Sequence, residues 1–167
     1  MSETTPAPAD NVKGDEALLI REGDIAGDYL ERLLDIIDAD GDIDLDVEND
    51  RAKVEVVGDG LQRLIGTNGQ TLEALQELTR LAVVQQTGVR SRLMLDVGGH
   101  RARRRDELAQ LGRRSAEEAL ASGERVVLAP MTPFERKVVH DAVAAIHGVV
   151  SESEGTEPER RVVVLPA

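Results

Sequence analysis

Hydrophobic and polar residues alternate with two different periods in the first part of the chain. Over residues 23–38 the hydrophobic positions recur at helical spacing, which predicts an amphipathic helix. Over residues 42–48, DIDLDVE, acidic and aliphatic residues alternate strictly, which predicts a strand with one face in solvent. Asn49 and Asp50 form a two-residue hairpin turn into a second strand over residues 51–57. In that register two opposite-charge pairs lie across the strands: Glu48 with Arg51, and Asp46 with Lys53.

After the hairpin, helical spacing returns on both sides of a glycine-containing corner. We expect a short helix over residues 59–65 and a longer one over residues 70–86, which Gly88 ends. Residues 90–97, RSRLMLDV, form a third strand that a glycine pair at 98–99 closes. The apolar face of the longer helix is expected to carry Leu72, Leu75, Leu78 and Ala82.

The second half of the chain predicts another α+β unit. A long helix over residues 100–122 is followed by a short strand over residues 124–129 and a helix that begins near residue 132. Two more strands, over residues 149–153 and 160–166, are joined by a turn. The helix near residue 132 has an N-cap, a proline at its first position and a capping-box acid: Thr132, Pro133 and Glu135.

The fold class is therefore α+β, with three parts along the chain. Residues 1–20 are rich in Pro, Ala and acids without a period, which predicts a disordered acidic tail. Residues 21–98 and 99–167 form the two folded domains, separated at the glycine pair.

The amino-acid composition excludes several structural and functional classes of protein. Tyr29 and Phe134 are the only aromatic residues, so modules that stack bases on aromatic rings are excluded. The chain has no Cys, which rules out disulfides and fits a reducing cytoplasm. No apolar run is long enough to insert into a membrane, and the first residues lack the order of a secretory signal. We expect a cytoplasmic protein without integral membrane insertion.

Charge is distributed unevenly along the chain, whose net charge is -12. Residues 1–50 hold 16 acids against three basic residues, whereas residues 51–167 hold 16 acids against 17 basic residues. A basic patch at the junction of the two domains is a candidate for phosphate contact, although a solvated start of a helix is the alternative. Its residues are Arg90, Arg92, Arg101, Arg103, Arg104 and Arg105.

The corner LIGTNGQTL combines two glycines with the start of a helix. Without a Cβ at Gly66 and Gly69, a sugar-phosphate chain can approach the main chain closely. The free N–H groups at the start of the helix then favour phosphate, aided by the helix dipole. Ile65 and Leu72 offer an aliphatic wall for bases. The alternative is an ordinary connection in which the glycines only ease the turn.

The order of elements around this corner favours the binding interpretation. From residue 22 to residue 97 the chain resembles a type II KH domain, whose Gly-x-x-Gly loop holds the backbone of about four nucleotides. The resemblance implies a phosphate-facing loop followed by Gln70, and a base-facing groove formed with the strand over residues 92–97. This loop lacks the basic residue that many KH loops carry, because its central positions are Thr67 and Asn68.

A second candidate site lies on the helix that begins near residue 132. Arg136 and His140 are four residues apart and share a face, and Lys137 is adjacent. A guanidinium fork suits phosphate, whereas a solvated Arg and a locally packed His are the alternative. Over residues 101–167 the sequence resembles the Arg-x-x-x-His domain, written here as R-three-H, in which the Arg and His contact single-stranded nucleic acid.

A KH domain followed directly by an R-three-H domain is typical of the bacterial Jag family, also called KhpB. The resemblance implies binding of single-stranded RNA in the cytoplasm, as a post-transcriptional regulator or RNA chaperone linked to cell-envelope growth and cell shape. It also implies a second small KH protein as a candidate partner. Many members carry an extra N-terminal Jag domain, where we expect the acidic tail in this chain.

Two other functions were weighed against RNA binding. A protein-interaction adaptor at the envelope or ribosome would use the acidic first half to attract a basic protein. A hydrolase would need a general base beside a nucleophile, and no such set is evident, so we expect no catalytic residues. The acids of DADGDIDLD lack the glycine spacing of a calcium loop, and with three His and no Cys we expect neither a metal nor a cofactor.

Overall fold

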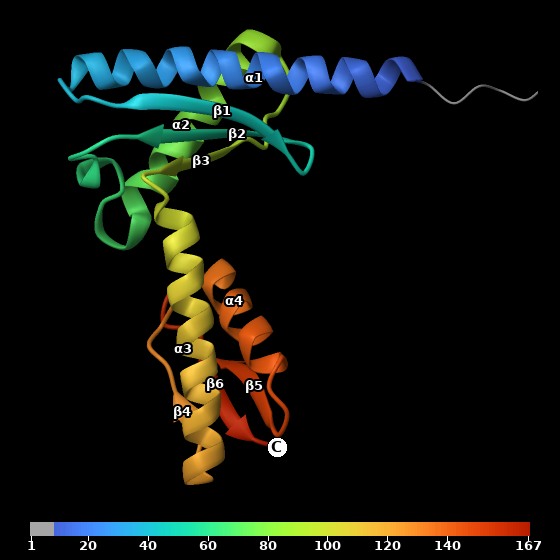
Figure 1. Cartoon of the computed structure of the whole chain (residues 1–167), viewed down its shortest axis with the longest axis vertical. Coiled ribbons are helices and arrows are strands. Elements are labelled where there is room, and N and C mark those ends of the chain that lie inside the picture. The colour runs from blue at the N-terminus through green and yellow to red at the C-terminus, as the bar shows by residue number, and fades with distance from the viewer. Residues whose placement is uncertain (1–8) are drawn as a thin grey trace, which may run out of the picture. The chain divides into compact units, whose positions relative to one another are not determined.

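The computed structural model describes the backbone of residues 9–167 and the side chains from residue 15 onward. The chain divides into two compact units, one that ends at His100 and one formed by Arg101–Ala167. The first contains α1 (Ala9–Ile36), β1 (Asp42–Glu48), β2 (Arg51–Val57), the 3-10 turns η1 (Gln62–Leu64) and η2 (Thr67–Gly69), α2 (Gln70–Thr87) and β3 (Met94–Val97) (Figure 1).

The sheet of the first unit has the order β1-β2-β3, with β1 antiparallel and β3 parallel to β2. The expected register is confirmed, because Glu48 lies opposite Arg51 and Asp46 lies opposite Lys53. The turn residues Asn49 and Asp50 both have positive φ, 53° and 57°. A two-residue hairpin turn of this hand requires that conformation at both positions, which Asn and Asp tolerate.

Helices α1 and α2 pack with the sheet around one hydrophobic core. The strands contribute Val54, Val56, Leu95 and Val97, each 0% exposed, and the helices contribute aliphatic residues such as Leu30. Most outward-facing positions of β1 and β2 are acidic or basic. The sheet therefore has one covered apolar face and one polar face.

The structure corrects three expectations in this unit. Helix α1 begins at Ala9, so residues 9–20 are helical rather than disordered, while residues 1–8 lie outside the described residues. The half-buried Leu18 and Leu19 lie one helical turn before the buried Glu22 and Gly23, so the packed face extends beyond the predicted start. The helix expected over residues 59–65 is only the turn η1, and the third strand is limited to β3.

The orientation of α2 also differs from expectation. Leu78 is 52% exposed, because the buried face of the helix passes through Gln76, Thr79 and Val83 instead. The Thr79 hydroxyl donates to the Leu75 carbonyl, and this contact allows a polar residue in the core. The expected helix end is confirmed at Gly88, which has the left-handed φ of 71°.

The second unit contains α3 (His100–Ser122), β4 (Val126–Val127), α4 (Pro133–Ala144), β5 (Val149–Glu154) and β6 (Arg161–Pro166) (Figure 1). Its sheet has the order β4-β6-β5, with both pairs antiparallel. Helix α3 approaches α4 closely at Gly112, where an added Cβ would lie 2.9 Å from the Ala142 Cβ. The capping box is confirmed, because Thr132 accepts from the Glu135 N–H and Glu135 accepts from the Thr132 N–H.

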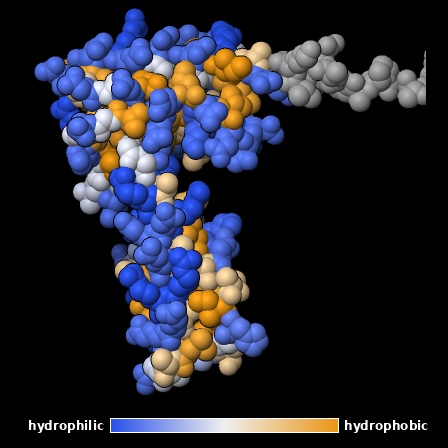
Figure 2. Space-filling model, viewed as in Figure 1, coloured by the Kyte–Doolittle hydropathy of each residue, from blue (hydrophilic) through white to orange (hydrophobic). Residues whose placement is uncertain are grey.

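The visible faces of both units mix hydrophobic and hydrophilic residues, without one continuous apolar patch (Figure 2). No helix among the described residues combines the length and the hydrophobicity that a membrane crossing requires.

Candidate nucleic-acid interface

The glycine corner between η1 and α2 needs glycine at both positions, for two different reasons. Gly66 is exposed with a φ of 72°, and an added Cβ would collide with the Thr71 hydroxyl. Gly69 is buried and left-handed at the N-cap position of α2, with a φ of 74°. Positive φ is strained for residues with a Cβ, so both positions are specified by backbone conformation.

The two central residues of the corner present their backbone to solvent. Thr67 and Asn68 are exposed, and Asn68 is left-handed with a φ of 54°. Within the described part of the chain, neither of their backbone N–H groups has an acceptor. The corner is held from inside, because the Leu72 N–H donates to the Ile65 carbonyl over 3.1 Å. Its outer surface is therefore open.

His100, which the sequence predicted only as the start of a helix, lies beside this corner. Its Nε2 is 3.1 Å from the position that a Cβ on Gly69 would occupy. A residue larger than glycine at position 69 would press on this imidazole as well as strain the backbone. No sequence pattern links His100 to a corner about 30 positions earlier, so only the fold brings them together.

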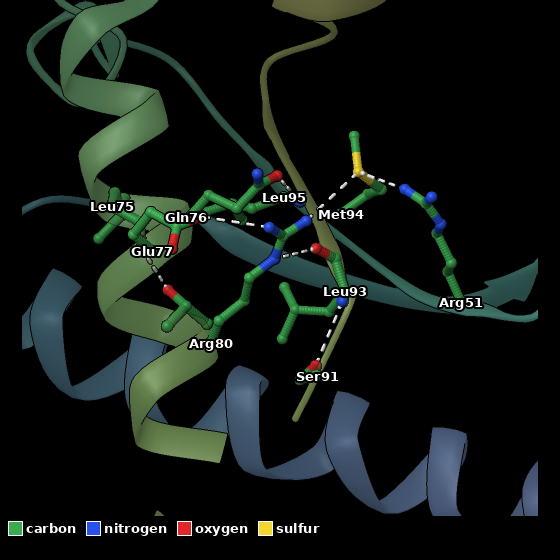
Figure 3. Close-up of polar contacts among 10 residues, drawn as sticks. Arg51, Leu75, Gln76, Glu77, Arg80, Ser91, Leu93, Met94 and Leu95 are labelled. Carbon is green, nitrogen blue, oxygen red and sulfur yellow. Dashed lines mark hydrogen bonds and ion pairs between the residues drawn. The ribbon is translucent and has the colours of Figure 1, made fainter. Parts of the chain in front are cut away.

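The expected base-facing groove is partly filled by the protein itself. Leu72 is 1% exposed, because it packs into the core, so only the half-buried Ile65 of the predicted wall reaches the surface. Gln70 is exposed beside the corner. The outer edge of β3 is occupied by α2, since the Leu95 N–H donates to Gln76 and Arg80 donates to the Leu93 carbonyl (Figure 3).

Arg136 on α4 is buried in the second unit rather than extended into solvent. It is 8% exposed, and its Nη1 donates to the Met131 carbonyl over 2.7 Å. Its Nη2 forms an ion pair with Glu157, which lies between β5 and β6. The guanidinium therefore already has a carboxylate partner within the protein.

His140 faces β5 and lies between two serine hydroxyls. Its Nδ1 is 2.6 Å from Ser151 Oγ and its Nε2 is 2.8 Å from Ser153 Oγ. Burial lowers the pKa of His140 below its ordinary value of 6.5; nearby Arg136 lowers it further, and Asp141 acts in the opposite direction. Ser151 and Ser153 are two positions apart on β5, so their side chains share one face of the strand. Their contact with His140 was not predicted from the sequence, although this spacing indicates their common face.

The remaining predicted basic residues occupy several environments. Lys137 forms an exposed ion pair with Asp141. Arg104 is bonded to Glu135 of the capping box, and the Arg105 guanidinium lies 5.7 Å from the centre of the Phe134 ring. Arg103 is exposed and Arg101 is half-buried, both in the first turns of α3.

Arg90 and Arg92 lie in the first unit, far from its glycine corner. They follow the C-terminal end of α2, and this helix of 18 residues begins at the glycine corner. At a rise of about 1.5 Å per residue, its length separates them from the corner by roughly 27 Å. They line a hollow with α1 and the tip of the β1-β2 hairpin. The residues of the predicted basic patch thus come from both units, Arg90 and Arg92 from the first and the other four from the second.

Glu22 is buried in α1 close to this hollow. Burial raises the pKa of Glu22, while a hydrogen bond with Ser91 and the charge of Arg92 act in the opposite direction.

Among the described residues, no group of three or more His, Asp or Glu side chains is placed to hold a metal ion.

Residues 106–166 match the R-three-H domain. The chain is also similar to proteins named RNA-binding protein KhpB. One from Lactiplantibacillus plantarum is 36% identical over 82% of this chain and 42% of its own length, and one from Clostridium symbiosum is 34% identical over 84% and 64%. A third, from Bacillus subtilis, is 30% identical over 81% of this chain and 66% of its own length.

The chain thus spans less than two thirds of the length of each of these relatives. Their names describe binding rather than a catalysed reaction, in agreement with the expectation that this protein is not an enzyme. The R-three-H match and these similarities show that the chain belongs to the Jag/KhpB family.

Proposed function

We propose that this protein binds single-stranded RNA at two sites on one chain and has no catalytic activity. The first site is the loop of a KH domain that spans residues 21–98, and the second lies in an R-three-H domain that spans residues 99–167. The bound RNA is held mainly through its backbone, because the chain has only two aromatic residues, Tyr29 and Phe134, on which bases could stack.

The observation that carries the proposal is the open backbone between Gly66 and Gly69. Two exposed N–H groups without an acceptor in the described chain, at the start of an 18-residue helix, form a site to which phosphate is attracted. Glycine at position 66 leaves room for the Thr71 side chain inside the corner, so the corner can fold with Thr67 and Asn68 facing solvent. The loop carries no charge of its own, so its affinity is modest.

The second site requires an exchange of partners. Arg136 is paired with Glu157, and an RNA phosphate would take the place of this carboxylate on the guanidinium. The Glu157 side chain is 51% exposed, so it can move into solvent without loss of packing. The R-three-H match and the names of the relatives support this site.

The family resemblance adds finer parts to the proposal. It favours a cytoplasmic post-transcriptional regulator or RNA chaperone that is linked to cell-envelope growth and cell shape. A second small KH protein is the partner that it suggests. Crosslinking in cells, followed by sequencing of the attached RNA, tests these parts, because a pure protein adaptor would yield protein adducts and little RNA.

The loop is tested by changing its charge. Thr67→Asp together with Asn68→Asp places two carboxylates against phosphate, and we expect binding of an unstructured RNA to weaken about tenfold or more at low salt. Thr67→Lys adds one phosphate contact, so it should tighten binding and steepen the salt dependence by about 0.7 in log-log slope. Fluorescence anisotropy in a salt titration measures both.

The matched control is Gln85→Glu with Gln86→Glu, which adds the same two charges on exposed residues at the far end of α2. It should bind RNA within about twofold of the wild type, since separated surface charges are screened. Equal binding by the loop variant and this control would disprove the role of the loop.

A further inference from the structure

The two edge strands of the sheet in the first unit, β1 and β3, differ in whether their outward backbone groups have hydrogen-bond partners. At the β3 edge the outward N–H groups belong to Leu93, Leu95 and Val97, and each donates to a side chain. The acceptors are Ser91 Oγ at 3.2 Å, Gln76 Oε1 at 3.0 Å and Asp96 Oδ1 at 2.8 Å. Arg80 in addition donates to the Leu93 carbonyl (Figure 3). This edge is closed to another strand.

The β1 edge lacks this protection. In a two-residue hairpin the pair next to the turn, Glu48 and Arg51, is hydrogen-bonded, so the alternate residues 43, 45 and 47 direct their N–H and C=O groups away from β2. Among the described residues, only the Val47 N–H has a partner, the Asp46 carboxylate at 2.8 Å. Unpaired edges of this kind are templates for another strand.

The apolar side chains of β1 are only partly covered by α1. Leu45 is 45% exposed and Val47 is 37% exposed, although Leu45 lies on the side of Gly23 and Gly27 of α1. A hollow of about 540 Å³ adjoins β1 and β2. Its lining residues are Ile43, Asp44, Leu45, Asp46, Lys53 and Glu55.

Charge selects among the strands that could pair here. The polar face of β1 carries four acids, Asp42, Asp44, Asp46 and Glu48, and the residue opposite Asp44 on β2 is Glu55. Like charges directly opposite each other destabilise a sheet, so this pair would gain from a cation beside it. The same acids repel RNA, and they repel the β1 of a second copy of the chain.

We propose that the β1 edge binds an extended segment of a partner protein in which Lys or Arg alternates with aliphatic residues. The segment adds a fourth strand to the sheet through the free N–H and C=O groups of Ile43 and Leu45. Its basic side chains lie over the acidic face, and its aliphatic side chains lie beside Leu45 and Val47. This interaction uses none of the residues of the proposed RNA sites.

The probe is a synthetic peptide as long as β1 in which Lys alternates with Val. Added to the full-length protein, it should slow hydrogen exchange at the Ile43 and Leu45 amides, measured by NMR, and give saturable binding in fluorescence anisotropy. The same peptide with N-methyl groups on alternate residues keeps its charge but cannot complete the ladder. It should bind about tenfold more weakly or worse.

Asp42→Lys with Asp44→Lys neutralises the net charge of the four acidic positions on β1 and is compatible with folding, because a lysine at position 44 would oppose Glu55 with opposite charge. The matched control, Glu117→Lys with Glu118→Lys, makes the same change in net charge on exposed residues of α3. The edge variant should lose about tenfold or more in affinity for the Lys-Val peptide, and the control less than about threefold.

Four results would overturn the proposal. The first three are equal loss of affinity in both variants, equal binding of the N-methylated peptide, and unchanged exchange at Ile43 and Leu45 when the peptide is bound. The fourth is self-association of the wild type that the edge variant abolishes, measured by sedimentation, because it would assign the edge to a second copy. None of these results depends on RNA binding, so the proposal for the β1 edge and the proposal for the RNA sites are tested independently.

Discussion

His140 is held in a way that favours its neutral form. Both ring nitrogens contact serine hydroxyls, and in the neutral ring one nitrogen donates while the other accepts. A serine hydroxyl can serve either role, so the neutral ring is fully satisfied. The neighbouring Arg136 opposes a positive charge on the ring, in line with the lowered pKa of His140.

This lowered pKa makes stability depend on pH in a defined direction. Between the lowered pKa of folded His140 and the ordinary value of 6.5, the unfolded chain binds more protons than the folded chain. The contribution of His140 is therefore complete above pH 6.5 and is lost as the pH falls towards the folded pKa. We expect the Tm of the wild type to fall from this source between about pH 7.5 and about pH 5.5.

The comparison variant is His140→Gln, whose amide can bond a serine hydroxyl but does not titrate. Thermal unfolding followed by circular dichroism should show a smaller loss of Tm on acidification in this variant than in the wild type. If both proteins lose the same amount, the acid sensitivity arises from other groups and His140 is not responsible.

At the scale of single residues, the sequence predicted what depends on neighbours along the chain. The glycines at 66 and 69 and the capping box at Thr132 are local features, so their spacing was sufficient. The partners of Arg136 and Gly69 are not local: Glu157 is 21 positions from Arg136, and His100 is in another helix. Such pairs follow from the packing of elements, which periodicity does not encode.

At the scale of elements, the ion pair between Arg136 and Glu157 joins the start of α4 to the connection between β5 and β6. The Arg136 side chain is 10% exposed and that of Glu157 is 51% exposed. The Glu157 side chain can therefore turn out into solvent more easily than the Arg136 side chain can. In the proposed binding mode, the Glu157 carboxylate competes with the RNA phosphate for Arg136.

Removing the charge of this competitor should strengthen RNA binding. Glu157→Gln keeps the size of the side chain but weakens its attraction to Arg136, so phosphate can replace it at lower cost. We expect the affinity of the full-length protein for unstructured RNA to rise roughly three- to fivefold, measured by fluorescence anisotropy.

Glu159→Gln is the matched control, because it removes the same charge from the same connection without changing a bond to Arg136. An equal gain in both variants would show a general effect of net charge. No gain in Glu157→Gln would show that phosphate does not compete for Arg136.

The elements themselves were predictable to different degrees. The hairpin and α3 were predicted with their bounds, because strict alternation and a long helical period leave few alternatives. The early start of α1 was missed because its first residues are mostly polar or small and show no apolar period; the first half-buried side chains among those described in the helix are Leu18 and Leu19. The exposure of Leu78 was missed because the apolar residues of α2 are compatible with more than one buried face. The face that is buried includes two polar residues, Gln76 and Thr79, which an apolar pattern does not identify.

At the scale of the whole molecule, acidic and basic residues are concentrated in different elements. The acids concentrate in α1 and on the open face of β1, whereas arginines begin α3. A chain of net charge -12 does not attract RNA over long distances, so the proposed binding would depend on close contacts at the loop and the R-three-H domain. The acidic surface would then limit contact with RNA to these proposed sites.

Two modest sites on one chain gain affinity when one RNA strand reaches both. The second contact is then intramolecular, and its effective concentration multiplies the affinity of the first. We expect an unstructured RNA long enough to span both domains to bind roughly 100-fold more tightly than a tetranucleotide that fills only one site. The loop variant Thr67→Asp with Asn68→Asp should remove most of this dependence on length, because it leaves one site, whereas Gln85→Glu with Gln86→Glu should retain it. Affinities for a series of RNA lengths measure this, and the same length dependence in both variants would show that the two domains do not share a strand.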